Sequence, residues 1–222
     1  MKKKVLLIVG IILGVGIIIS GIIYFMRSPD APVLVDNYVP KTNIICIDAG
    51  HGGSDPGAVS GDRQEKIDTF ALALRVASYI EKAGYTPLLT RNDDSYLSLG
   101  DRCAIANDAQ AAYFVSIHRN SAVDGKGTEV WISSEKTAAE KHLAQHILKA
   151  LDEVGIQANR GVKAGMQGDS KGDYAVNRNT NMPSCIVELG FIGNDEDNRL
   201  LDKHIDDYAK AIADAIVKLM KR

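Results

Sequence analysis

The stretch IDAGHGGSDPGAVSG, residues 47–61, leaves an apolar run and passes abruptly into glycine. The residues just before it, 43–48, read NIICID, a short apolar run that is typical of a buried strand. Five glycines then fall within the twelve positions from Gly50 to Gly61, with one histidine, His51, among them. Glycine adopts backbone conformations that other residues avoid, so we expect a tight turn that presents one imidazole at the end of a strand.

Beyond this stretch, strand-like and helix-like segments alternate along the chain. Apolar residues at helical spacing predict helices over residues 66–83, 98–109, 138–154 and 202–220. Apolar runs of strand length fall at residues 85–90, 112–118, 128–133 and 184–191. This alternation predicts an α/β fold, a single three-layer domain in which helices cover both faces of a mixed, mainly parallel sheet.

The N-terminus differs in character from the rest of the chain. Residues 2–4 are lysines, and residues 5–25 form 21 positions without a charge. At about 1.5 Å per residue, such a helix covers a hydrocarbon core of roughly 30 Å. The flanking lysines favour a cytoplasmic N-terminus, and the bulky residues after the run do not resemble a cleavage site. We therefore expect residues 1–27 to be an uncleaved signal anchor, a single transmembrane helix in the cell membrane.

This orientation puts the rest of the chain on the extracytoplasmic side of the membrane. Residues 28–42 hold three prolines and no helical period, which predicts an extended linker. Residues 28–222 carry 22 basic and 28 acidic side chains, a balance that argues against nucleic acid as a partner. The three cysteines form no CxxC pair, so we interpret them as buried apolar residues and not as a disulfide framework or metal site.

Polar side chains accompany three of the predicted strands. His51 follows the first strand, His118 ends the strand over 112–118, and Glu188 lies within the strand over 184–191. In open α/β sheets, functional groups gather beyond the carboxyl ends of the strands. Neutral imidazole is a common zinc ligand, so the two histidines indicate a metal site at this edge of the sheet.

Four carboxylates near these histidines allow more than one interpretation. Glu65 opens a predicted helix, where the helix dipole alone would favour a carboxylate. Glu188 lies inside the apolar run CIVELGF, where an unpaired charge is costly unless it does chemistry, for example as a general base beside a metal-bound water. Asp48 and Asp55 either orient His51 through its second ring nitrogen or cap turns.

Six segments, in order, resemble the zinc-dependent N-acetylmuramoyl-L-alanine amidases of bacterial cell walls. They read IICIDAGHGGSDPGAVSG, QEKIDTFALALRVASYI, LLTRNDD, DRCAIANDAQAAYFVSIHRNSA, GTEVW and SCIVELGFIGNDEDNRLL. The resemblance identifies residues 43–222 as a zinc amidase catalytic domain. It implies hydrolysis of the amide between N-acetylmuramic acid and the L-alanine of the peptidoglycan stem peptide by a zinc-activated water.

The resemblance also implies a role for each candidate residue. His51, Glu65 and His118 are the expected ligands of a Zn²⁺ cofactor, and Glu188 is the expected catalytic glutamate. Peptidoglycan is the expected partner, in wall remodelling, cell separation or spore cortex processing, and any protein activator is unknown. The alternatives are a zinc hydrolase of another peptide or amide on the same fold and a non-catalytic descendant that binds the cell wall.

Two features are particular to this chain. Arg119 occupies a position that is usually small or aliphatic in the family, and we expect it to contact an anionic stem peptide or to face solvent. Only 70 residues separate His118 from Glu188, so we expect no long inhibitory insertion over the zinc. Three further histidines lie on predicted helices and are interpreted as surface residues; they are His142, His146 and His204.

Overall fold

A computed structural model describes residues 37–135, 137–169 and 172–221 of the chain. The predicted signal anchor, residues 1–27, and residues 28–36 of the predicted linker lie outside the described residues. Within the described part, no helix combines the length and the apolar character needed to cross a membrane.

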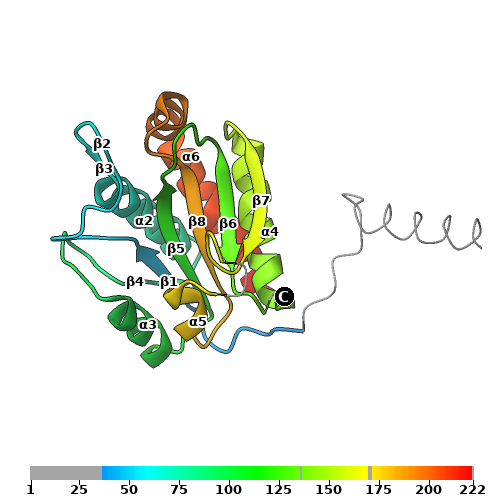
Figure 1. The fold of residues 1–222 in the computed structure, drawn as a ribbon. Coiled ribbons are helices and arrows are strands. Elements are labelled where there is room, and N and C mark those ends of the chain that lie inside the picture. Colours follow the sequence, from blue (N-terminus) through cyan, green and yellow to red (C-terminus); the bar gives the residue numbers. More distant parts are fainter. Residues whose placement is uncertain (1–36, 136, 170–171, 222) are drawn as a thin grey trace, which may run out of the picture. The chain divides into compact units, whose positions relative to one another are not determined.

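A six-stranded sheet forms the middle layer of the fold (Figure 1). Its strands lie side by side in the order β4-β1-β5-β8-β6-β7. Their bounds are β1 (Ile44–Ala49), β4 (Thr86–Leu89), β5 (Tyr113–Asn120), β6 (Thr128–Ile132), β7 (Asn159–Ala164) and β8 (Ser184–Phe191). Strand β6 runs antiparallel to β8, and the other four neighbouring pairs of the described sheet are parallel. The predicted mixed, mainly parallel sheet is confirmed.

Helices cover both faces of this sheet (Figure 1). On one face lie α2 (Glu65–Lys82), α4 (Ala138–Val154) and α6 (Asp195–Met220); on the other lie α3 (Leu99–Asp108) and α5 (Ala175–Asn179). Successive strand residues point to opposite faces of a sheet. Ile45 and Ile47 of β1 therefore join the core with α2, α4 and α6, whereas Cys46 joins the core with α3 and α5. The predicted three-layer architecture is therefore confirmed.

The structure contains elements that the sequence pattern did not predict. Strand β7 lies at the sheet edge and reads NRGVKA, which has too few apolar residues to stand out. Helix α5 has five residues, and a short hairpin joins β2 (Val59–Ser60) to β3 (Arg63–Gln64). Helix α6 begins seven residues before the predicted start, where the Asn194 side chain accepts a hydrogen bond from Asp197 N.

The predictions for cysteine and histidine have mixed outcomes. All three cysteines are buried, as expected. His146 and His204 are partly exposed. The prediction that His142 is a surface residue is wrong, because it is 4% exposed and follows Ala139 by three positions on the packed face of α4.

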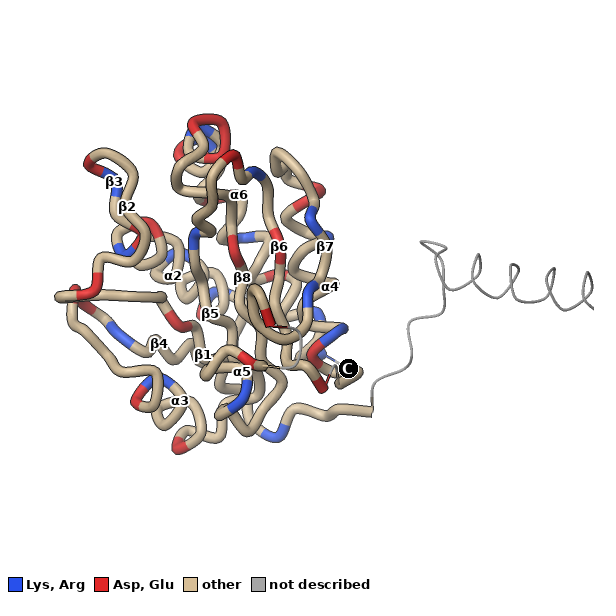
Figure 2. The backbone as a smooth tube through the Cα atoms, in the orientation of Figure 1, with Lys and Arg blue, Asp and Glu red and all other residues tan. Residues whose placement is uncertain are grey.

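The candidate residues meet at the carboxyl ends of the central strands. Strands β1, β5 and β8 are neighbours and parallel, so their ends reach the same edge of the sheet. His118 of β5 stands directly opposite Glu188 of β8, and Glu188 is in turn paired with Glu129 of β6. Figure 2 shows acidic positions within β8 and β6, and neither strand carries any other charged residue.

Candidate functional site

The loop after β1 has an unusual backbone that depends on glycine. His51 has φ of 62°, which makes it one of three non-glycine residues with positive φ in the described part of the chain. Such a conformation costs an ordinary residue roughly 1–2 kcal/mol. A Cβ atom at Gly50 would lie 2.4 Å from His118 Cε1, so only glycine lets the loop approach the end of β5.

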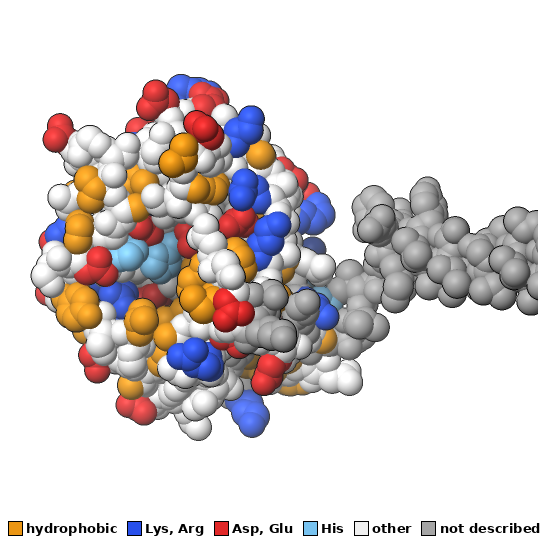
Figure 3. Space-filling view, in the orientation of Figure 1, with side chains coloured by type: hydrophobic (Ala, Val, Ile, Leu, Met, Phe, Trp, Pro, Cys, Tyr) orange, Lys and Arg blue, Asp and Glu red, His pale blue; other side chains and the backbone are white. Residues whose placement is uncertain are grey.

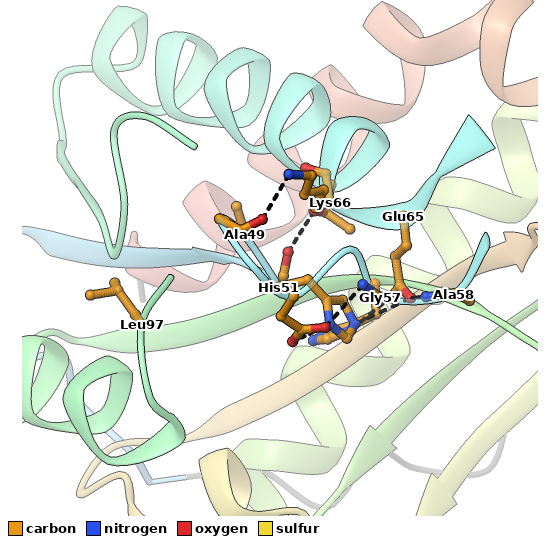
Figure 4. Close-up of polar contacts among 12 residues, drawn as sticks. Ala49, His51, Gly57, Ala58, Glu65, Lys66 and Leu97 are labelled. Atoms are coloured by element: carbon orange, nitrogen blue, oxygen red, sulfur yellow. Dashed lines mark hydrogen bonds and ion pairs between the residues drawn. The ribbon is translucent and has the colours of Figure 1, made fainter. Parts of the chain in front are cut away.

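This loop, β5 and α2 bring His51, Glu65 and His118 together. Figure 4 shows the side chains of His51 and Glu65 directed toward each other. One possible ligand atom from each residue lies within 4.8 Å of the others. His51 Nε2 is 3.2 Å from Glu65 Oε2, and His118 Nδ1 is 2.9 Å from Glu65 Oε1. The structure therefore joins all three residues that the sequence predicted as metal ligands, although they are up to 67 positions apart.

The surroundings of Glu65 fix its carboxylate firmly. Besides the two histidines, Oε2 accepts a hydrogen bond from Ala58 N at 2.9 Å, and Oε1 accepts one from Arg119 N at 2.9 Å. Although burial alone would raise the pKa of Glu65, its hydrogen bonds with His118 and His51 hold that pKa far below the usual range. Glu65 is thus held as an anion between the two imidazoles.

The pKa values of the two imidazoles shift in the opposite direction to that of Glu65. Burial alone would lower the pKa of His118, but its hydrogen bond to Glu65 and the charge of Glu188 raise that pKa to about 9. The pKa of His51 is raised as well, because Glu65 and Asp55 outweigh its burial. The surrounding carboxylates therefore favour a positive charge between these side chains. Two imidazoles and one carboxylate are a recurrent donor set for catalytic zinc, so the residues present fit a zinc ion.

Asp55 and Asp48 have different functions beside the cluster. Asp55 Oδ2 lies 2.8 Å from His51 Nδ1, and its Oδ1 accepts a hydrogen bond from Gly57 N at 3.0 Å. Asp55 therefore both orients the imidazole and caps a turn, which combines the two interpretations of the sequence. Asp48 accepts its hydrogen bonds from Arg102, Thr90 and Ser116 instead.

Glu188 provides a carboxylate of a different kind. Its Oε2 atom is buried and has no hydrogen-bond partner among the described residues. Burial raises the pKa of Glu188 to about 7; Glu65 and Glu129 add to this rise, and His118 opposes it. A carboxyl group with this pKa can both accept and release a proton near neutral pH.

An open cleft gives access to the cluster. Figure 3 shows histidine side chains at the floor of a hollow with apolar side chains around it. The cavity beside His51 and His118 has a volume of about 350 Å³. Its wall is largely apolar and includes Tyr96, Leu97, Leu99, Tyr174, Val176 and Ile186. A substrate can thus reach the ligand atoms from solvent.

Three buried arginines near the site were not recognised as such from the sequence. Arg119 is 3% exposed and donates to Asp68 Oδ2 and, at 2.6 Å, to Asn198 Oδ1. Both expectations for Arg119 are therefore wrong: it neither faces solvent nor is free to contact a stem peptide. Arg91 and Arg102 are also 3% exposed. The one available signal for Arg102 was its place in the DRCAIAN segment, on the packed side of a short helix.

Comparison with known proteins assigns these features to one family. Residues 45–218 match the family model described as N-acetylmuramoyl-L-alanine amidase. A sporulation-specific N-acetylmuramoyl-L-alanine amidase of Bacillus subtilis (strain 168) is 39% identical over 154 residues. That match covers 67% of this chain and 56% of the relative, so this chain spans little more than half of its length.

Solved structures support the same assignment. The catalytic domain of CwlV, an N-acetylmuramoyl-L-alanine amidase from Bacillus (Paenibacillus) polymyxa var. colistinus, superposes with a TM-score of 0.72 at 32% identity, covering 80% of this chain and 98% of that domain. The CwlD amidase from Clostridioides difficile, solved in complex with the GerS lipoprotein, also gives a TM-score of 0.72, at 30% identity, covering 80% of this chain and 98% of that one.

Proposed function

Because this chain belongs to the N-acetylmuramoyl-L-alanine amidase family, we propose that it is a zinc enzyme that hydrolyses the amide between N-acetylmuramic acid and the L-alanine of peptidoglycan stem peptides. The family match and the related amidases support the reaction. The observation that carries the proposal is the convergence of His51, Glu65 and His118 beside the unpartnered oxygen of Glu188.

His51, Glu65 and His118 are the residues that would hold the zinc ion. When bound, zinc supplies Lewis-acid chemistry: it polarises a carbonyl and lowers the pKa of a water molecule. Asp55 supports this arrangement by its contact with His51 Nδ1, which leaves the lone pair of Nε2, on the side of Glu65, available to the ion. His51 and His118 line the cleft, so water and substrate would reach an ion held by these residues from solvent.

Glu188 is the residue that moves the proton. Its Oε2 accepts a proton from the attacking water and then delivers it to the L-alanine nitrogen as the amide C–N bond breaks. The products are the lactyl carboxylic acid and a stem peptide with a free amine. Burial raises the pKa of this carboxyl group to about 7, which suits both transfers.

We further propose that residues 1–27 anchor the enzyme in the cell membrane, with the catalytic domain on the extracytoplasmic side where peptidoglycan lies. The support is the sequence: lysines at residues 2–4 precede 21 positions without charge. Protease treatment of intact protoplasts tests this topology. Digestion of the catalytic domain without lysis supports the proposal, and protection until lysis contradicts it.

The relatives suggest where this activity is used. One is named as sporulation-specific, which supports a role during sporulation, such as the spore cortex processing expected from the sequence. The complex of the CwlD amidase with a lipoprotein supports a search for a protein partner of this chain.

Product analysis by mass spectrometry tests the proposed reaction. Purified peptidoglycan is digested with the full chain in mild detergent, with a chelator, and with the chelator followed by added zinc. We expect intact stem peptides with a free L-alanine amine, lost with the chelator and restored by zinc. Cleavage of a different amide would instead favour the alternative zinc hydrolase. Stoichiometric zinc without any cleavage would favour a wall-binding protein or an enzyme that needs an activator.

A further inference from the structure

The left-handed backbone of His51 needs a stabilising partner. Its φ of 62° sets the direction of the Cα–Cβ bond, and so sets where the imidazole lies. A return to negative φ would turn the ring away from Glu65. The neighbouring glycines permit this loop conformation but do not by themselves select it, because glycine is free to adopt others.

Arg102 of α3 supplies such a partner. Its Nη2 atom donates a hydrogen bond to the carbonyl oxygen of His51 at 2.8 Å. Its Nη1 atom donates to the carbonyl oxygen of Ala49 at 2.7 Å and to Asp48 Oδ1 at 2.7 Å. The guanidinium fork thus spans both sides of the turn, which a rigid planar group does better than a point charge.

The guanidinium group is itself fixed by the central strands. Asp48, at the end of β1, is 1% exposed and also accepts hydrogen bonds from Thr90 at 2.7 Å and from Ser116 of β5 at 2.6 Å. The Nε atom of Arg102 donates to the carbonyl oxygen of Leu97 at 3.2 Å. Asp48 is therefore held by the central strands, Asp48 holds the guanidinium group of Arg102, and Arg102 holds the carbonyl group of His51.

We propose that Arg102 is a positioning residue for metal binding: it holds His51 in the left-handed conformation that directs the imidazole toward Glu65 and His118. This inference rests on the proposed function only in that it takes the ion at the cluster to be zinc. A second buried arginine, Arg91, donates to Ala49 O, Gly50 O and Lys66 O but not to His51 O. Contact with the carbonyl of a proposed ligand is thus what sets Arg102 apart from Arg91.

The test is the zinc affinity of the full-length Arg102→Lys variant, measured by competition with a chromophoric chelator. Lysine keeps a positive charge for Asp48 but cannot span the two carbonyls. We expect zinc affinity to fall by about ten- to 100-fold, as is usual when a partner of a metal ligand is lost. We also expect the visible spectrum of the cobalt-substituted protein to change, because the geometry of one ligand changes. Arg102→Gln provides a second variant with the same expectation.

Ile147→Val is the matched control for lost stability alone. Ile147 is fully buried in α4, in the core on the opposite face of the sheet. This variant should bind zinc with unchanged affinity and give an unchanged cobalt spectrum. The inference is overturned if both Arg102 variants are folded by circular dichroism and bind zinc within about threefold of the unaltered chain. It is also overturned if Ile147→Val weakens zinc binding equally.

These readouts separate the inference from the proposed function. Zinc affinity is measured without peptidoglycan, so a failure to cleave the proposed amide does not change the result. Failure of the unaltered chain to bind zinc would overturn the proposed cofactor and the inference together. Normal zinc binding by the Arg102 variants would overturn the inference alone.

Discussion

Two glutamates at the same edge of the sheet have opposite surroundings. Glu65, at the start of α2, has both oxygens engaged by imidazoles and backbone N–H groups, and its pKa is lowered. Glu188, near the end of β8, has a buried oxygen with no partner among the described residues, and burial raises its pKa to about 7. A ligand needs a fixed charge and a proton carrier needs a charge that changes, so the surroundings support the two proposed roles.

The largest effect that this comparison predicts is on turnover by Glu188→Gln. The amide cannot accept the proton of the attacking water, so we expect the rate of amide hydrolysis to fall by about 10²–10⁴-fold. Zinc content should stay at one ion per chain. The measurement is the rate of release of stem peptides from purified peptidoglycan, followed by mass spectrometry.

Glu129→Gln is the control for Glu188→Gln. Glu129 pairs with Glu188 in the sheet register, but its oxygens accept hydrogen bonds from Asn120, Trp131 and Arg160. We expect this variant to lose less than about tenfold in rate, because Glu129 adds to the rise in the pKa of Glu188 but does not itself carry the reacting proton. Near-normal turnover by Glu188→Gln, or an equal loss in both variants, would contradict the assigned role.

The second effect concerns Glu65→Gln and should appear in metal binding. Removal of the ligand charge also removes the anion that both imidazoles face, so we expect zinc affinity to fall by more than about 100-fold. Glu188→Gln should bind zinc within about threefold of the unaltered chain. Competition titrations with zinc measure the affinity of both variants. Equal zinc affinities would contradict the different roles proposed for Glu65 and Glu188.

A smaller effect on zinc affinity is expected for Asp55→Asn, because Asp55 contacts a proposed ligand and is not proposed to be one itself. Asp55 lies 2.8 Å from His51 Nδ1, but its side chain is 42% exposed, so water can replace part of the interaction. We expect zinc affinity to fall by about tenfold, at the lower end of what such partners contribute. Isothermal titration with zinc measures the change, and a loss as large as that of Glu65→Gln would mean that Asp55 is itself a ligand.

Local patterns in the sequence were enough to predict the fold class and to single out three of the four candidate residues at the centre of the site. Short apolar runs marked the strands at the middle of the sheet, and His51, His118 and Glu188 lie at or near their ends. Glu65 required the family resemblance, because a carboxylate at the start of a helix has an ordinary explanation. The edge strand β7 was missed because edge positions do not require continuous apolar residues.

The long-range charge pairs could not be predicted from local pattern. Arg102 pairs with Asp48 across 54 positions, and Arg119 pairs with Asp68 across 51 positions. A local window shows only a charged residue, for which exposure is the usual expectation. Burial becomes favourable only when the fold brings a carboxylate or a carbonyl to the guanidinium group.

The smallest predicted effect concerns Asp202, an acidic residue outside the proposed metal site. Asp202 pairs with Arg63 at 2.7 Å, and Arg63 contacts Asp68. The hydrogen bonds from Arg63 lower the pKa of Asp202 below its ordinary value of 3.8. Asp202 therefore contributes stability above pH 3.8 and loses it as the pH falls through the lower, folded-state pKa.

Asp202→Asn measures this contribution. We expect the variant to be less stable than the unaltered chain at pH 7 by up to about 1 kcal/mol, as for an exposed ion pair. The difference should shrink as the pH falls below 3.8, and zinc affinity should not change. Urea unfolding at pH 7 and pH 3 tests the pH dependence, and a difference that grows toward acid would contradict the predicted sign.

The division of roles between the two glutamates is tested most directly by an anomalous difference map at the zinc absorption edge, from crystals grown with zinc. We predict one peak bonded to His51, Glu65 and His118 at about 2.0–2.2 Å, with Glu188 Oε2 outside bonding distance and facing the open position. A zinc ion bonded to Glu188, or a peak that omits Glu65, would contradict the account.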